Sequence, residues 1–518
     1  MEHRCIVNAT HTTGSTLPGD AVRVTCRAAD GRTHTSIHSS TVPQPRRLTE
    51  LRSLVRDHAA TNLSFYLLSF DSVSRMAAMR SLPKTMRYLT DSLDAAVFQG
   101  YNIVGDGTPA AFTPILTGGD EDEMPDCYKA HKNSQTIDVF PMIWKNFSAA
   151  GYATLYGEDT AKIGTYTYRM NGFLRQPTDH YTRMFYLRAE QLQASLMDLI
   201  KWHYVSCIGD EPQHNVFMRI AAEMFDNYPA DVPKFAVMHH GGLSHDDVNT
   251  IQVADADIEA HIRYMHTRGH LNNSIFIFMA DHGHRFNAEL RSTYQGQLEE
   301  RLPLFTIVAP HWFRHGSFGG SAWQNVLNNR FSLTTPFDVH FTLRHLLKWH
   351  QPRTAAIERE RGVSLFDHIP RHRTCRQAGV KAHWCACLQW HAVSMNQTRI
   401  QKISSEIVNA INNRTALHRR LCAPLTLVKV TSAKRLALQN DRNHRQQPAA
   451  VQYQVRIRTT PGDAHYEATV LWRNDRPQQP VAVDLNVVSQ INAYGDNPHC
   501  IIDKDHSMAK FCICFDKI

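Results

Sequence analysis

The chain has 518 residues, 42% hydrophobic and 20% charged, a composition that excludes a largely disordered protein and allows one large domain plus a smaller one. Its formal net charge is +8, but Lys and Arg are scattered, with no basic run or aromatic-interleaved basic patch, so we expect no nucleic-acid partner. No apolar run is long enough to cross a bilayer, so we expect no transmembrane segment.

The first segment, residues 1–60, is predicted to be irregular and polar. It contains Cys5 and Cys26, and the stretch STVPQPRR near its end is typical of a linker. The opening residues, MEHRCIVNATHTTG, lack the apolar stretch of a signal peptide.

Residues 61–370 alternate between strand and helix patterns. Short apolar runs bounded by turn residues predict buried strands at NLSFYLLSFD, YATLYG, KFAVMHH, SIFIFMAD and LPLFTIVAP. Helical spacing is found in SLPKTMRYLTDSLDAAVF, DADIEAHIRYMHTRGHL and TTPFDVHFTLRHLLKWH. This alternation predicts an α/β domain with a mainly parallel sheet.

Residues 371–518 are predicted to form a small, cysteine-rich β-containing domain. The runs VQYQVRIRT, YEATVLW and VAVDLNVVSQI suggest antiparallel strands. The pairs in WCAC and FCICF lack the C-x₂-C rhythm of zinc ribbons, so we expect disulfides. The total of 11 cysteines is odd, which leaves at least one without a partner in this chain. Seven lie in this segment: Cys375, Cys385, Cys387, Cys422, Cys500, Cys512 and Cys514.

Disulfides require an oxidising compartment. Glycosylation sequons favour the same location and occur at Asn8, Asn62, Asn146, Asn272, Asn396 and Asn413. We therefore expect an extracellular or secretory-lumen glycoprotein whose signal peptide is not present in this sequence.

Two predicted strands end in an aspartate. Asp71 follows FYLLSF, and Asp281 follows IFIFMA with His282 directly after it. Ligands of open α/β sheets bind beyond the carboxyl ends of the strands, and a divalent cation would offset the cost of burying these groups together. The alternative is that each aspartate caps the next helix. That alternative stays open for Asp71, whereas the D-H-G triplet favours a metal site.

A third feature is the stretch GDGTPAAFTPILTG. Thr108 precedes Pro109, which is favoured at the first position of a helix, and Gly118 is the expected helix stop. Thr108 would then lie at a helix N-terminus that attracts anions. Its hydroxyl could be an N-cap, or a nucleophile if a metal lowers its pKa.

This ordered set resembles the alkaline phosphatase–sulfatase superfamily and, within it, the sulfatase-like animal family DUF229. In sulfatases, the glycine of the T-G pair that ends the helix lies ten positions after the cysteine of C-x-P-S-R. Gly118 likewise lies ten positions after Thr108, which puts Thr108 at the position of that cysteine. The resemblance spans roughly residues 62–350. It implies an alkaline-phosphatase-like three-layer α/β/α fold, Thr108 as nucleophile, and Asp71, Asp281 and His282 as metal ligands.

A further likeness lies in FAVMHHGGLSH, which resembles the F…A-P-H stretch of sulfatases and the H…G-S-H of phosphoethanolamine transferases. It implies that His245 is a second-site metal ligand or substrate contact. His240 is a weaker substrate-binding candidate and His239 a weaker one still. Arg285 either contacts a substrate oxyanion or forms a surface ion pair. Possible partners of His245 at a second site are Asp255, Asp257, His284 and His340, although Asp257 matches a structural aspartate of sulfatases and is set aside for that reason.

Departures from the sulfatase motifs narrow the possible chemistry. C-x-P-S-R is absent, which excludes formylglycine, and Ser72 stands where sulfatases have a second acid. His282 in place of an amide favours zinc over manganese or calcium. We expect a metal-dependent hydrolase or transferase acting through Thr108 on phosphate or sulfate esters, carried by a glycan or lipid. The alternative is a catalytically inactive extracellular binding or structural protein with the same fold.

Overall fold

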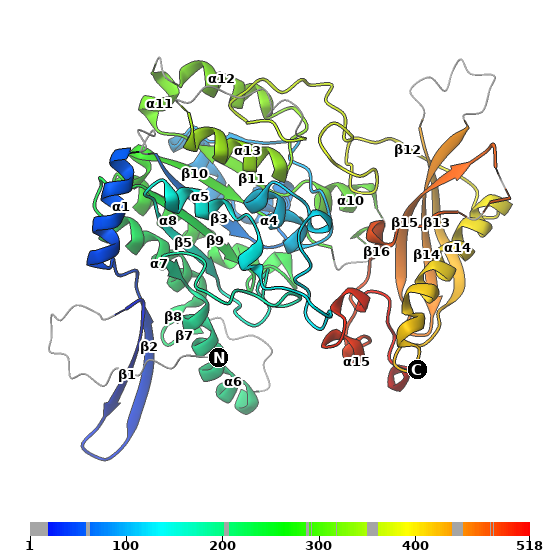
Figure 1. Ribbon diagram of the computed structural model, residues 1–518, viewed down its shortest axis with the longest axis horizontal. Helices are drawn as coiled ribbons and strands as arrows, with labels where there is room; N and C mark the ends of the chain where they lie inside the picture. The colour runs from blue at the N-terminus through cyan, green and yellow to red at the C-terminus, as the bar shows by residue number, and fades with distance from the viewer. Residues whose placement is uncertain are drawn as a thin grey trace.

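The computed structural model describes residues 19–57, 63–200, 207–285, 290–291, 293–316, 319–349, 361–437, 449–476, 478–479 and 481–518, with backbone alone for 193–200. A large α/β domain occupies the centre, and a separate antiparallel sheet lies at the C-terminal end (Figure 1). No helix within these residues is both long enough and apolar enough to span a bilayer.

The central sheet has seven strands: β3 (Ser64–Phe70), β4 (Ala96–Val97), β5 (Ala153–Glu158), β6 (His180–Tyr181), β9 (Lys234–His240), β10 (Ser274–Met279) and β11 (Phe305–Val308). Their order is β4-β11-β10-β3-β9-β5-β6. The five strands from β10 to β6 are parallel, whereas β11 and β4 each pair antiparallel with their neighbour. All five strands that the sequence predicts here are present, which confirms the mainly parallel sheet.

Helices cover both faces of this sheet. In β3, Tyr66 and Leu68 face one hydrophobic core, and Phe65 and Leu67 face the other. The first core is closed by α2 (Arg75–Ser81), α3 (Pro83–Arg87), α6 (Arg183–Ile200), α7 (Gln213–Asn227) and α8 (Asp255–Thr267). The second is closed by α4 (Thr108–Thr117), α5 (Ile143–Ala149), α11 (His311–His315), α12 (Gly320–Asn329) and α13 (Pro336–Leu347). The three-layer α/β/α fold follows from this strand alternation.

The N-terminal segment is more regular than its sequence suggests. Strands β1 (Ala21–Arg27) and β2 (Thr33–Ser39) form a hairpin that projects from the domain (Figure 1). Helix α1 (Pro45–Asp57) begins inside the stretch interpreted as a linker. Pro45 at the first helical position needs no N–H partner there, and Leu51 is fully buried against the first core. The prediction that residues 1–60 are irregular is therefore wrong for the part that the structure describes, residues 19–57.

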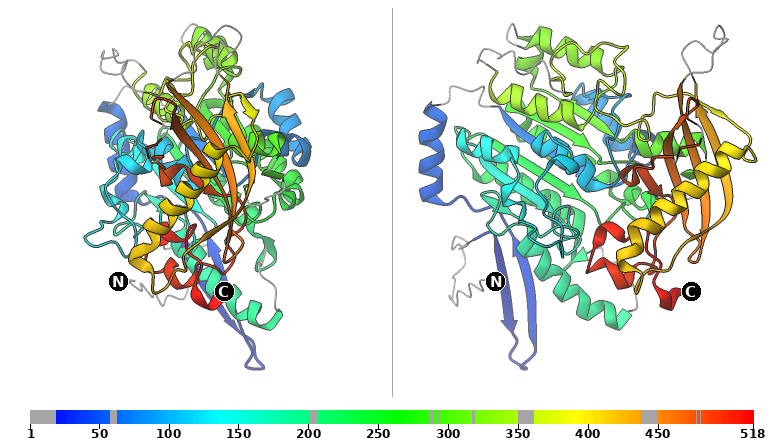
Figure 2. Two further views of the ribbon diagram at one scale, coloured as in Figure 1. Left: turned by 90° about the vertical axis from the view of Figure 1, so that its right-hand side faces the viewer. Right: turned by 45° about the vertical axis from the view of Figure 1, so that its right-hand side comes forward.

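The C-terminal sheet runs β12-β13-β14-β15-β16 and is antiparallel throughout. Helix α14 (Thr398–Arg414) packs on it through the buried side chains of Ile400, Ile403, Ile407 and Ile411 (Figure 2). This helix is not among the predicted elements, although its isoleucines recur at helical spacing. The strands are β12 (Trp390–Ala392), β13 (Thr426–Leu436), β14 (Ala450–Thr460), β15 (His465–Arg473) and β16 (Val488–Gln490).

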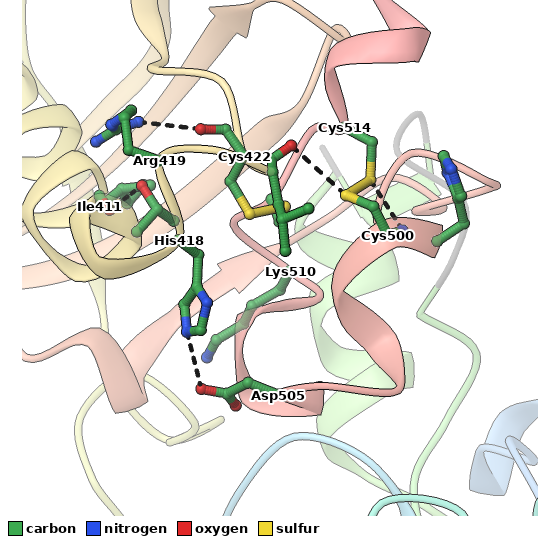
Figure 3. The surroundings of a disulfide bond; sticks show 12 residues. Ile411, His418, Arg419, Cys422, Cys500, Asp505, Lys510 and Cys514 are labelled. Carbon is green, nitrogen blue, oxygen red and sulfur yellow. Dashed lines mark hydrogen bonds and ion pairs between the residues drawn. A yellow bond between two sulfur atoms is a disulfide. The ribbon is translucent and has the colours of Figure 1, made fainter. Parts of the chain in front are cut away.

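Three disulfides join Cys375 to Cys385, Cys422 to Cys512 and Cys500 to Cys514, which confirms disulfides over zinc in this region. Two of them lie together, beside short helix α15 (His499–Ile502) (Figure 3).

The first disulfide packs instead with Ile103 and Leu333 of the α/β domain. We therefore propose that the C-terminal domain begins near residue 389 rather than 371.

Candidate metal centre and nucleophile

Strands β3 and β10 bring the two strand-end aspartates together. They are adjacent and parallel, with Ser69 in register with Met279, so Asp71 and Asp281 each follow two residues beyond the same level of the sheet. The backbone N–H of Ser72 donates to Asp281 Oδ1 at 3.1 Å. Asp71, Asp281 and His282 are 4%, 0% and 2% exposed, so bulk water does not solvate their charges.

These three side chains converge. Oxygen or nitrogen atoms, one from each, lie within 4.8 Å of one another. His282 Nδ1 lies 2.9 Å from the Gly283 carbonyl and must donate to it, which leaves a lone pair on Nε2. Nε2 lies 3.3 Å from Asp281 Oδ2 and 3.7 Å from Asp71 Oδ1.

Among the described residues, neither His282 Nε2 nor Asp281 Oδ2 has a hydrogen-bond partner. An imidazole lone pair facing two buried carboxylates is costly by itself, and a divalent cation would satisfy all three groups. The donor set therefore fits a metal ion.

Gly283 completes the D-H-G triplet for a packing reason. A Cβ at this position would overlap the carbonyl of Glu299 in α10 (Tyr294–Arg301), and the Gly283 N–H donates to the Glu300 carbonyl at 2.9 Å. The contact between this loop and α10 holds the segment that carries Asp281 and His282.

Thr108 lies beside the cluster. Its Oγ1 donates to Asp71 Oδ2 at 3.3 Å. Helix α4 begins at Thr108 itself, with Gly107 as the cap, so the helix starts one residue earlier than predicted. Gly118 ends it in the left-handed conformation, as expected.

Arg285 is held against the same helix start. Its guanidinium donates to Asp106 Oδ1 at 2.6 Å, and its Nη2 lies 3.2 Å from the point where a Cβ on Gly107 would be. Arg285 is only 7% exposed, so the ion pair is buried and not on the surface. The Arg285 guanidinium thus lies beside the N-terminus of α4, where Thr108 begins the helix, and such an arrangement can bind an oxyanion.

His239, the weakest of the predicted histidine candidates, is the histidine of β9 that reaches the cluster. Its Nε2 lies 3.6 Å from Asp71 Oδ2, and its ring packs edge-on against Phe112 of α4. Burial opposes protonation of His239, but the contact with Asp71 and the charge of Asp281 raise its pKa to about 9. Burial likewise opposes ionisation of Asp71, but His239, His282 and His245 hold the pKa of that carboxyl well below its usual range.

The substrate-binding prediction for His240 does not fit the structure. Successive strand residues point to opposite faces, so His240 lies on the side away from His239. It is 0% exposed, stacks on Phe70 and lies 3.3 Å from Asp159 through Nε2. A substrate cannot reach this side chain.

Of the second-site candidates, two lie near the cluster. His245 shares a hydrogen bond of 2.7 Å with Asp246, and its charge interacts with that of Asp71. His284 is close enough to His282 and His245 that their charges, after burial, help to lower its pKa.

The other three have structural roles. Asp255 accepts from the N–H groups of Lys84 and Thr85, Asp257 pairs with His214, and His340 donates to the Ile115 carbonyl. They do not join the cluster because each is committed to a neighbouring helix.

A profile of the family described as Protein of unknown function (DUF229) matches residues 4–431. The chain belongs to this family. The match covers the whole α/β domain and confirms the resemblance drawn from the motifs. No curated protein matches the chain.

Three bacterial proteins are among the solved structures with a similar course of the chain. An alkaline phosphatase superfamily protein from Vibrio parahaemolyticus is 13% identical, with a TM-score of 0.41 over 89% of this chain and 94% of that one. The lipoteichoic acid synthase LtaP from Listeria monocytogenes is 12% identical, with a TM-score of 0.39 over 62% and 81%. The periplasmic domain of EptC from Escherichia coli is 12% identical, with a TM-score of 0.34 over 55% and 82%.

Proposed function

We propose that the chain is a metal-dependent hydrolase or transferase that acts on phosphate or sulfate esters, with Thr108 as nucleophile. The observation that carries this proposal is the buried convergence of Asp71, Asp281 and His282, within 4.8 Å of one another, beside the Thr108 hydroxyl. The resemblance of the motifs to those of sulfatases, in a chain that belongs to the DUF229 family, supports the ester class of substrate.

Asp71, Asp281 and His282 would hold the metal, with Thr108 as a further ligand and His245 as a second-site ligand. The set of one imidazole and two carboxylates suits zinc better than calcium, which takes six to eight oxygens. Manganese is intermediate in its preference for these ligands. The chemistry that such an ion supplies is a lowered pKa of the nucleophile and a polarised ester oxygen.

The protein groups then carry the reaction. Thr108 Oγ1, oriented by its hydrogen bond to Asp71, gives up its proton to water and forms a bond to the phosphorus or sulfur while the bond to the leaving alkoxide breaks. The alkoxide takes up a proton from water and leaves as the alcohol. Arg285 and the N–H groups at the start of α4 bind the ester oxygens as their charge shifts. Water, or an acceptor hydroxyl, then releases the group from Thr108.

We also propose an extracellular or secretory-lumen location. Three disulfides support it, and they persist in oxidising compartments. The sequon residues Asn146, Asn272, Asn396 and Asn413 are all exposed, so glycans would meet no steric barrier; Asn8 and Asn62 lie outside the described residues.

The decisive experiment measures metal content and turnover together. Elemental mass spectrometry of the purified chain should find one or two zinc or manganese ions, lost in Asp281→Asn and kept in Asp257→Asn, whose carboxylate pairs with His214 instead. Bis(4-nitrophenyl) phosphate, 4-nitrophenyl phosphate and 4-nitrophenyl sulfate are then tested as substrates.

Thr108→Ala should abolish turnover, whereas Thr117→Ala, at the other end of α4, should retain it. A chain that stays metal-free after reconstitution, or a Thr108→Ala variant as active as wild type, would instead indicate a binding or structural protein or a different nucleophile.

A further inference from the structure

A polar cleft of about 500 Å³ lies between the α/β domain and the C-terminal domain. Its lining includes Gly105, Asp106 and Ala110, on either side of Thr108, together with C-terminal residues such as Lys510 and Phe511. The C-terminal segment around α15 and these last residues lies between the two domains (Figures 1 and 2). The volume is within the range of about 300–1,000 Å³ that small-molecule sites occupy.

The walls of the cleft carry charges of both signs. Cations such as Arg169, Lys381 and Lys510 face carboxylates such as Asp106, Glu121 and Asp484. A polyanion or a polycation would meet like charges on these walls, and an acyl chain would desolvate them without compensation. A neutral ligand rich in hydroxyls suits both signs, because each hydroxyl donates to a carboxylate and accepts from a guanidinium or ammonium.

Arg169 is the cation with most capacity for a ligand. It is half-buried, and no group that the structure describes forms a hydrogen bond or an ion pair with its guanidinium. Two half-buried phenols, Tyr128 and Tyr494, share the same lining. Aromatic rings with a polar edge pack against the C–H faces of sugar rings while leaving the hydroxyls to polar neighbours.

Asp106 connects the cleft to the segment that carries the candidate nucleophile. Asp106 lines the cleft and also holds Arg285 over Gly107, next to Thr108. The charge of Arg285 also interacts with Tyr494, so Tyr494 too lies near the start of α4.

We propose that this cleft binds the sugar rings of a carbohydrate ester whose phosphate or sulfate lies at Thr108, with Arg169 and Tyr494 as the residues that select the sugar. The inference rests on the proposed function for its ester. Sugar binding itself is measurable without any turnover, so the two can fail separately.

The test is saturation-transfer NMR on the full metal-loaded chain with three unesterified glycans: chitotriose, mannotriose and lacto-N-tetraose. At least one should receive magnetisation, with its affinity reduced at least about 10-fold in Arg169→Ala and in Tyr494→Ala. Matched controls are Arg175→Ala and Tyr264→Ala, both exposed residues outside the cleft. They should bind as wild type does.

Three results would overturn the proposal. The first is no magnetisation transfer to any of the three glycans, and the second is transfer that both cleft variants retain in full. The third is transfer only to glycerophosphoethanolamine or uridine, which would assign the cleft to a lipid headgroup or a nucleoside. If the chain turns over no ester but binds a glycan through Arg169 and Tyr494, the proposed function fails while the cleft assignment stands.

If the chain is active, kinetics add a second readout. Arg169→Ala should raise KM for N-acetylglucosamine 6-phosphate or 6-sulfate at least about 10-fold more than it raises KM for the corresponding 4-nitrophenyl ester. Equal effects on both esters would place Arg169 at the reacting group instead of the sugar and contradict the proposal.

Discussion

The backbone N–H of Ser72 and the carboxylate of Asp281 are 3.1 Å apart, and this contact joins the end of β3 to the end of β10. Ser72 adopts a positive φ of 61°, and its hydroxyl donates to Asp71 Oδ1 at 2.8 Å. One residue therefore supports both carboxylates of the candidate metal centre, at the position where sulfatases carry a second acid.

Replacing Ser72 with glycine should weaken metal binding without weakening the fold. Glycine accepts the positive φ and keeps the N–H that binds Asp281, but it removes the hydroxyl bound to Asp71. Loss of such a support typically costs about 10- to 100-fold in metal affinity. Competition with a chromogenic chelator measures the affinity; an unchanged affinity would mean that Asp71 does not need this hydroxyl.

Replacing Gly107 with alanine should impair both folding and turnover. Gly107 has φ of +89°, and a Cβ there would lie 3.2 Å from the Arg285 guanidinium, so Arg285 must shift by a few tenths of an ångström. Backbone strain of this kind costs about 1–3 kcal/mol of unfolding free energy.

Gly209→Ala is the matched control, because Gly209 also has a positive φ but open space around it. It should lose stability in urea unfolding and keep its turnover. Equal turnover in the two variants would show that the position of Arg285 does not matter for the reaction.

The disulfide between Cys422 and Cys512 should stabilise the chain more than the one between Cys375 and Cys385. The two close loops with sequence separations of 90 and 10 residues. In the chain-entropy model, these loops correspond to about 4.6 and about 2.7 kcal/mol of unfolding free energy. Chemical unfolding of the two double Cys→Ala variants checks the order, and the reverse order would mean that packing around Cys375 dominates.

Acid should destabilise the chain through His383. This side chain is 1% exposed and bonds Thr469 with Nδ1 and Ser489 with Nε2, which joins it to β15 and β16. Burial lowers its pKa to about 3. The unfolded chain takes up the proton near pH 6.5 and the folded chain does not, so stability falls as the pH drops from about 6.5 towards 3.

The expected loss over that window is about 3–5 kcal/mol. His383→Gln retains hydrogen-bonding capacity but cannot titrate, so its unfolding free energy should depend less on pH there. Urea unfolding at several pH values compares the two proteins, and parallel pH profiles would show that other groups carry the acid sensitivity.

Much of the site is determined by local sequence. The apolar runs before Asp71 and Asp281 specify buried strands, and the acid at each strand end marks the edge of a parallel sheet where ligands bind. The spacing from Thr108 to Gly118 specifies helix α4 to within one residue at its start. These features depend on periodicity and capping, which act over a few residues.

Tertiary structure decided the rest, because register, face and docking depend on residues far apart in the chain. His239 and His240 are neighbours in sequence, but only the docking of α4 and α7 shows that the cluster side belongs to His239. The Arg285–Asp106 contact, the cysteine pairing and the approach of Tyr494 to Arg285 all join segments that no local pattern relates. The chemistry of the strand ends can thus be predicted from the sequence, whereas the groups that surround Thr108 depend on how the layers and the two domains pack.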